Sequence, residues 1–202
     1  MKIKVISLLL ISIFCFNSEN ASAQNFDINL LKSININRNK DLDPFFKATS
    51  NSVYPIMVIA PSAFFIHGLI KKDSLTLQDG IEIGVSVALT VAVSAGLKYA
   101  INRPRPYDEF PNIDNIATEN SPSFPSGHTS TAFSVATSVS LSYPKWYVIT
   151  PMYLWAGSVG YSRMHLGVHY PSDVFVGAII GSGCAYLSYK ANQWIRKRSP
   201  KR

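Results

Sequence analysis

The segment WYVITPMYLWAGSVGYS, residues 146–162, carries no charged side chain and is long enough to form a helix through most of a bilayer. Four further segments of helical length carry very few charges: residues 52–70, 79–100, 127–143 and 172–190. The whole chain is 47% apolar and only 15% charged, against roughly 25% charged residues in an average globular protein. These segments predict an all-α fold, an integral membrane bundle of about five transmembrane helices.

The segment 127–143, GHTSTAFSVATSVSLSY, differs from the others because it is rich in serine and threonine. Small hydroxyl side chains are poorly suited to face lipid, but they allow helices to pack closely together. We therefore expect this segment to form an interior helix of the bundle.

The N-terminus has the pattern of a cleavable secretory signal. Two lysines precede the apolar run 5–16, which is followed by a polar stretch and the small residues Ala21-Ser22-Ala23. An uncleaved signal anchor is the alternative, but the apolar run is short for a membrane span. The pattern predicts a signal peptide over residues 1–23 and a single domain over residues 24–202.

Residues 24–50 mix Asn, Asp and Lys with scattered Leu, Ile and Phe. This mixture predicts one amphipathic or interfacial helix that follows the signal peptide and ends near Phe45 and Phe46.

Charge is distributed unevenly between the predicted connections. A cleaved signal followed by five spans places these basic residues on the cytoplasmic side: Lys71, Lys72, Lys145, Lys190, Arg196, Lys197, Arg198, Lys201 and Arg202. The loop 106–126 on the other side holds four acidic residues and no Lys or Arg. The positive-inside rule then predicts a multi-pass protein of the bacterial inner membrane, with this loop in the periplasm. The net charge of +7 therefore flanks apolar spans, and without a recognisable binding motif it argues against a nucleic-acid partner.

Three polar clusters lie at the predicted outer ends of the helices. The first is Lys98-Tyr-Ala-Ile-Asn-Arg-Pro-Arg105-Pro106. Lys98 and Arg105 would share one face if the helix ran straight through, and the prolines predict that it ends near the membrane surface. The second is Pro125-Ser126-Gly127-His128, directly before a helical run, and the third is Ser162-Arg163-Met-His165-Leu-Gly-Val-His169-Tyr-Pro-Ser-Asp173. Taken singly, such clusters also occur as snorkelling charges or plain helix caps.

Together the clusters suit a phosphoryl group. Lys98, Arg105 and Arg163 can neutralise its oxygens, and the helix start at Ser126 and Gly127 offers backbone N–H donors. The imidazoles can attack phosphorus or transfer a proton near neutral pH. A metal site is disfavoured, because the two arginines would repel a cation and few carboxylates lie near the histidines.

With these three motifs, the sequence resembles the type 2 phosphatidic acid phosphatase (PAP2) superfamily, in its membrane lipid phosphatase branch. The signatures read here as Lys98-x6-Arg105-Pro106, Pro125-Ser126-Gly127-His128 and Ser162-Arg163-x5-His169-x3-Asp173. The resemblance covers residues 98–173 directly. It implies a phosphatase with no cofactor and no metal requirement, so EDTA is not expected to inhibit it directly.

The resemblance also implies a role for each matching residue. His169 would be the nucleophile that forms a phosphohistidine, Asp173 would orient its imidazole, and His128 would protonate the leaving oxygen. The remaining residues would hold the phosphate: Lys98, Arg105, Arg163, the Ser126 hydroxyl and the Gly127 backbone N–H. His165 and His67 match no fixed signature position, and we expect both to be structural.

Several alternatives stay open at this stage. A soluble periplasmic acid phosphatase also carries a signal peptide and similar signatures, although the uncharged segments favour the membrane form. A haloperoxidase is disfavoured because this chain is short for building an additional oxidant site. A non-enzymatic lipid-phosphate-binding protein is disfavoured because binding alone would require neither a nucleophile nor a proton donor. As substrate, an outward-facing site favours undecaprenyl diphosphate first and a lipid A phosphate second, with phosphatidate and phosphatidylglycerol phosphate also open. The sequence leaves the oligomeric state undetermined.

Overall fold

The computed structural model describes residues 20–117 and 119–198, and this part of the chain is helical and contains no strand. The elements are α2 (Asn20–Asn35), the 3-10 helix η1 (Lys40–Leu42), α3 (Asp43–Asn51), α4 (Val53–Lys71), α5 (Ser74–Ile101), α6 (Pro106–Glu109), α7 (Gly127–Ser142), α8 (Trp146–His165) and α9 (Pro171–Arg198). All five segments expected to be helical are present as α4, α5, α7, α8 and α9. The predicted signal peptide lies mostly outside the described residues.

The expected single helix over residues 24–50 is wrong. The chain leaves α2 at Asn35, and the side chain of Asn39 then accepts a hydrogen bond from the Asp41 N–H, which starts η1 instead of prolonging α2. Pro44 stands in the first turn of α3, where its missing N–H costs nothing. Phe45 and Phe46 therefore lie inside α3, and do not end a helix.

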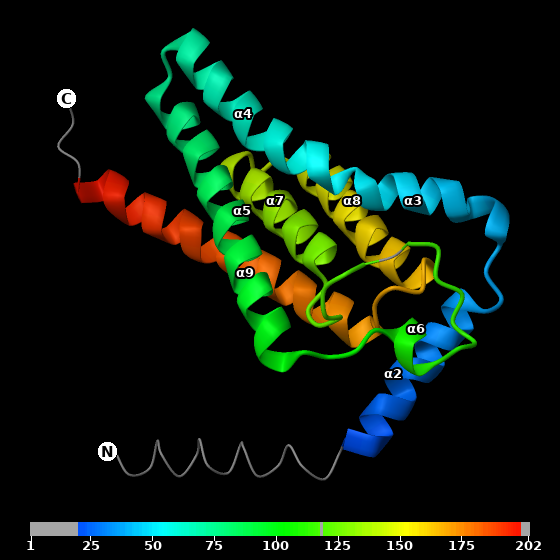
Figure 1. Cartoon of the computed structure of the whole chain (residues 1–202). Helices are drawn as coiled ribbons and strands as arrows, with labels where there is room; N and C mark the ends of the chain where they lie inside the picture. The colour runs from blue at the N-terminus through cyan, green and yellow to red at the C-terminus, as the bar shows by residue number, and fades with distance from the viewer. Residues whose placement is uncertain (1–19, 118, 199–202) are drawn as a thin grey trace, which may run out of the picture.

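Helix α7 occupies the interior of the bundle, as its small hydroxyl residues predict. It packs against α4, α5, α8 and α9 (Figure 1), and most of its residues are buried. The contact with α9 is close because α9 presents glycines: a Cβ added at Gly181 would overlap the carbonyl oxygen of Ser130. Small side chains on both helices thus bring two backbones together.

Helix α5 ends earlier than a continuous helix through Arg105 would require. Asn102 adopts a left-handed conformation (φ 49°) and closes α5 before the first proline. Lys98 and Arg105 therefore do not share a helical face. They come together instead because the chain turns after Asn102, before α6 begins at Pro106.

Three helical stretches among the described residues are long and apolar enough to cross a membrane: Lys40–Lys71, Ser74–Glu109 and Pro171–Arg198. Helix α7 has only 16 residues and is enclosed by the others. Figure 1 shows α2, α6 and the loop segments 110–117 and 119–126 at one end of the bundle, and the α4–α5 turn and the end of α9 at the other. The chain is an integral membrane protein, and the number of five spans stays a prediction.

Candidate active site

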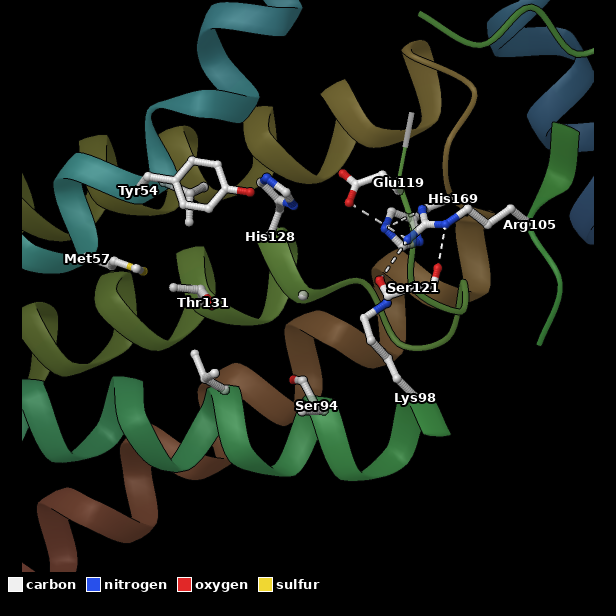
Figure 2. Close-up of a pocket in the computed structure, with 14 residues that line it drawn as sticks. Tyr54, Met57, Ser94, Lys98, Arg105, Glu119, Ser121, His128, Thr131 and His169 are labelled. Carbon is white, nitrogen blue, oxygen red and sulfur yellow. Dashed lines mark hydrogen bonds and ion pairs between the residues drawn. The ribbon is translucent and has the colours of Figure 1, made fainter. Parts of the chain in front are cut away.

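His169 lies in the short connection between α8 and α9, only 1% exposed. Its Nδ1 is 3.4 Å from Oδ2 of Asp173, which stands one turn further along the chain in α9. Its Nε2 is 3.4 Å from a guanidinium nitrogen of Arg105 (Figure 2). The carboxylate can therefore accept a hydrogen bond from Nδ1–H, which leaves Nε2 unprotonated, with its lone pair toward the Arg105 guanidinium.

Asp173 is itself fixed by several donors and is fully buried. Its Oδ2 accepts hydrogen bonds from the Ser123 hydroxyl and, at 3.0 Å, from the backbone N–H of Tyr170. Its Oδ1 accepts a hydrogen bond from Arg103 at 2.7 Å. A carboxylate with this many donors holds one orientation.

Arg103 belongs to a chain of contacts that the sequence reasoning missed. Besides Asp173, it pairs with Asp27 of α2 at 2.8 Å and lies over the ring of Tyr170 at 3.8 Å. Asp27 also accepts hydrogen bonds from the N–H and hydroxyl of Ser172. Arg103 stands at a variable position inside the first signature, and 76 residues separate it from Asp27 in sequence. The signatures alone therefore gave no signal for this pairing.

The loop 121–123 brings Lys98 and Arg105 to the same place. Lys98 donates to the carbonyl of Pro122 at 2.5 Å, and Arg105 donates to the carbonyls of Ser121 and Val168, both at 2.8 Å. Backbone carbonyls thus hold two cations beside His169. Lys98 keeps one hydrogen for a ligand, whereas Arg105 would exchange its longer contacts, to the Ser121 hydroxyl at 3.3 Å and the Pro122 carbonyl at 3.4 Å, for a ligand oxygen.

Arg163 approaches from α8, where it is 2% exposed and donates to the Ser50 hydroxyl at 2.6 Å. It also forms a close ion pair with Glu119, whose second oxygen lies 4.0 Å from Arg105. Glu119 thus bridges two of the three cations expected to hold phosphate. Burial alone would raise the pKa of Glu119, but the positive charges around it, first that of Arg163, lower it. As one acid among four in its loop, it carried no sequence signal.

The second signature begins α7. Ser126 is the N-cap and fully buried, and its hydroxyl lies 2.9 Å from that of Thr129. Gly127 and His128 line a cavity beside His169, whereas the Ser126 hydroxyl is hydrogen-bonded to Thr129 within the helix cap. The signature therefore supplies a helix N-terminus and an imidazole directly to the cavity.

The cavity has a volume of about 290 Å³ and two different ends. Its polar end is lined by Lys98, Arg105, Glu119, Gly127, His128 and His169. Its apolar end is lined by Val53, Tyr54 and Met57 of α4 and by Val91 and Ala95 of α5. Figure 2 shows His128 between the two ends, beside Tyr54. The centroids of the two rings are 5.2 Å apart. One cavity therefore joins an anion site to an apolar wall.

The charges around His169 set its protonation state. Burial, followed by the positive charges of Arg163, Arg105 and Lys98, holds the pKa of His169 well below its ordinary value. The imidazole is therefore neutral at physiological pH, as a nucleophile must be.

The two other histidines lie elsewhere, as expected. His165 places Nε2 at 2.7 Å from Asp43 and its ring against Phe46, and so fastens α3 to α8. His67 lies in α4 near the α4–α5 turn, at the opposite end from His169.

Comparison with known proteins gives a consistent set of relatives. The sequence model described as the PAP2 superfamily matches residues 79–197. Undecaprenyl-diphosphatase of Sulfolobus acidocaldarius is 30% identical over 81% of this chain and 77% of its own length. Lipid A 4'-phosphatase of Bacteroides thetaiotaomicron is 32% identical over 52% of each chain.

Two solved structures resemble the whole bundle. Aquifex aeolicus LpxE superposes with a TM-score of 0.69 at 30% identity and covers 82% of this chain and 95% of its own. The transmembrane PAP2 type phosphatidylglycerolphosphate phosphatase from Bacillus subtilis has a TM-score of 0.73 over 99% of this chain and 98% of its own. At 23% identity, the second likeness concerns the fold alone.

Proposed function

We propose, from the premise that this chain belongs to the PAP2 superfamily and is a membrane lipid phosphatase, that its substrate is undecaprenyl diphosphate or a chemically similar lipid diphosphate. A lipid A phosphate is the second candidate. The supporting relatives include one named for each of these two activities.

The observation that carries the proposal is the continuity of the cavity. Its polar end gathers cations around a neutral imidazole, and its apolar end is a wall of α4 and α5 side chains. A water-soluble phosphate ester would use the first end only. A lipid phosphate whose chain starts at the membrane surface uses both, because Tyr54 and Val91 of the apolar wall are 55% and 47% exposed on the surface of α4 and α5.

The chemistry follows from the contacts of each side chain. Nε2 of His169 attacks phosphorus while the bond to the leaving oxygen breaks, and His128 gives that oxygen a proton. Lys98, Arg105 and Arg163 neutralise the charge that develops on the remaining oxygens. In the second step water attacks the phosphohistidine, His128 takes the proton, and inorganic phosphate leaves. Asp173 keeps the imidazole oriented throughout.

The orientation of the site is part of the proposal. Lys71, Lys72 and the basic end of α9 lie at the end of the bundle opposite the catalytic residues (Figure 1). The positive-inside rule assigns that end to the cytoplasm, and so assigns His169 to the periplasmic side of the bacterial inner membrane.

The direct test is phosphate release by the purified protein in detergent. The substrates are undecaprenyl diphosphate, lipid A, phosphatidate, phosphatidylglycerol phosphate and a water-soluble ester. We expect the fastest release from undecaprenyl diphosphate and its loss in His169→Ala. His67→Ala is the matched control, because it removes an imidazole far from the cavity and should leave release unchanged.

Either of two results would contradict the proposal. Phosphate release that persists in His169→Ala would show that His169 is not the nucleophile. Substrate binding without release, by folded wild-type protein, would favour a non-enzymatic lipid-phosphate-binding protein.

A further inference from the structure

A second cavity, of about 420 Å³, lies between α5 and α9. Glu82 lines it and precedes Lys98 by 16 residues on α5, which is about 24 Å of helix. The cavity therefore lies toward the α4–α5 turn, well away from the catalytic residues.

Glu82 is the unusual residue of this cavity. Its side chain is among the buried ones, at 3% exposure, and within residues 20–117 and 119–198 neither carboxylate oxygen has a hydrogen-bond partner. The hydroxyl of Ser188, which lines the same cavity, is equally unpartnered in this part of the chain, and the Ser138 hydroxyl of α7 lies within reach of Glu82. A buried carboxylate without donors is costly unless it takes up a proton or meets a ligand that supplies N–H groups and positive charge, and the cavity beside Glu82 has room for such a ligand.

The basic residue next to this cavity is already partly engaged. Arg196 donates through one guanidinium nitrogen to Asp79 at 2.6 Å and to the carbonyl of Leu75 at 3.2 Å. Its Nε has no partner among the described residues. A buried acid and a basic donor near it thus both have unused hydrogen-bonding capacity.

The walls of the cavity indicate an amphiphile. Val85, Leu187 and Ile195 line it, yet they are 54%, 64% and 58% exposed on the outer surface of α5 and α9. In a membrane protein these faces contact lipid, so the cavity opens to the bilayer. Its volume is also far larger than the ~30 Å³ that one water occupies, which argues against a bare ion.

We propose that this cavity binds a membrane lipid with a primary ammonium headgroup. The ammonium donates hydrogen bonds to Glu82, the lipid phosphate lies toward Arg196, and the start of one acyl chain follows the apolar walls. This inference is independent of the substrate that the catalytic cavity accepts, because the two cavities lie at different ends of α5.

The test is native mass spectrometry of the full chain, delipidated and then offered equal amounts of phosphatidylethanolamine, phosphatidylcholine and phosphatidylglycerol with the same acyl chains. Phosphatidylcholine keeps the positive charge but has no N–H to donate, and phosphatidylglycerol has no amine. We expect phosphatidylethanolamine to be retained at least about tenfold more than either, the size of one charge-assisted hydrogen bond. Glu82→Gln should lower its retention to the level of phosphatidylglycerol.

A second pair of variants separates headgroup from chain contacts. Leu187→Ala removes part of the cavity wall and should lower the retention of all three lipids by the same factor. Ile179→Ala is the matched control, because Ile179 is also exposed on α9 but lies outside the cavity, and it should leave the retention of each lipid unchanged. If Glu82→Gln does not fold, stepwise N-methylation of phosphatidylethanolamine on the wild type still tests the donor requirement, because retention should fall with each lost N–H.

Three outcomes would overturn the proposal. Equal retention of the three headgroups would show a nonspecific lipid groove. An ethanolamine preference that survives in Glu82→Gln would place the recognition elsewhere. Stabilisation of the delipidated wild type, but not of Glu82→Gln, by sodium or potassium ions alone, without headgroup preference, would show an inorganic cation site.

Discussion

Arg103→Ala tests whether the nucleophile depends on a residue that never contacts it. Arg103 donates to the buried Oδ1 of Asp173 at 2.7 Å. Breaking a fully buried pair costs about 3–5 kcal/mol. The Arg103 side chain is 22% exposed and Asp173 keeps its Ser123 and Tyr170 donors, so we expect a smaller loss, about 2 kcal/mol of unfolding free energy.

A fall in catalytic rate should accompany this loss of stability. Without Arg103, the Asp173 carboxylate is held through Oδ2 alone and can rotate relative to Nδ1, which misplaces the imidazole. We expect kcat to fall about 10- to 100-fold while KM changes little, because the three cations proposed to hold the phosphate are untouched. The assay is steady-state phosphate release together with trapping of the phosphoenzyme after rapid mixing. We expect phosphoenzyme formation to slow in parallel with kcat.

Arg38→Ala is the matched control. Arg38 is another buried arginine with two acidic partners, Asp43 at 2.9 Å and Asp114 at 3.0 Å, but it does not contact Asp173. It should lower stability without a comparable fall in kcat. The reasoning would be refuted if Arg103→Ala and Arg38→Ala lost the same stability and the same kcat, since Arg103 would then be only structural.

Three further predictions concern the anion site, the nucleophile and the helix packing. Glu119→Gln removes the carboxylate that bridges two guanidinium groups, so orthovanadate should inhibit at about tenfold lower concentration; an unchanged inhibition constant would show that Glu119 does not compete with the anion. Because the pKa of His169 is lowered in the folded state, the unfolded chain binds the extra proton below about pH 6.5, and stability should fall by up to about 1.4 kcal/mol per pH unit as the pH drops further. Thermal melting from pH 7.5 to 4.5 should show a steeper loss for the wild type than for His169→Ala, and parallel curves would contradict this. Gly181→Ala should destabilise the bundle by about 1–3 kcal/mol or more, because its Cβ would overlap Ser130, whereas Gly183→Ala should melt at or above the wild-type temperature, since no described atom lies within 4 Å of its Cβ.

The local parts of the fold and site could be predicted because neighbouring residues in the chain specify them. Ser126 caps α7 through its own first turn, and four residues place Asp173 one helical turn from His169. The run of small hydroxyl residues in α7 predicted an interior helix, because that composition has no stable place against lipid. These patterns carry their physical reason within about ten residues.

What the sequence could not determine depends on contacts between distant segments. The break between α2 and α3 places Asp27 against Arg103, 76 residues away, and the turn after Asn102 brings Lys98 and Arg105 together around the loop 121–123. Glu119 meets Arg163 across 44 residues. Each of these pairs needs the packed bundle to exist first, because an isolated charge has no preferred partner until burial removes water from it. The helices and the proximity of His169 to Asp173 could thus be predicted from neighbouring residues, whereas the other charges around His169 follow from contacts within the packed bundle.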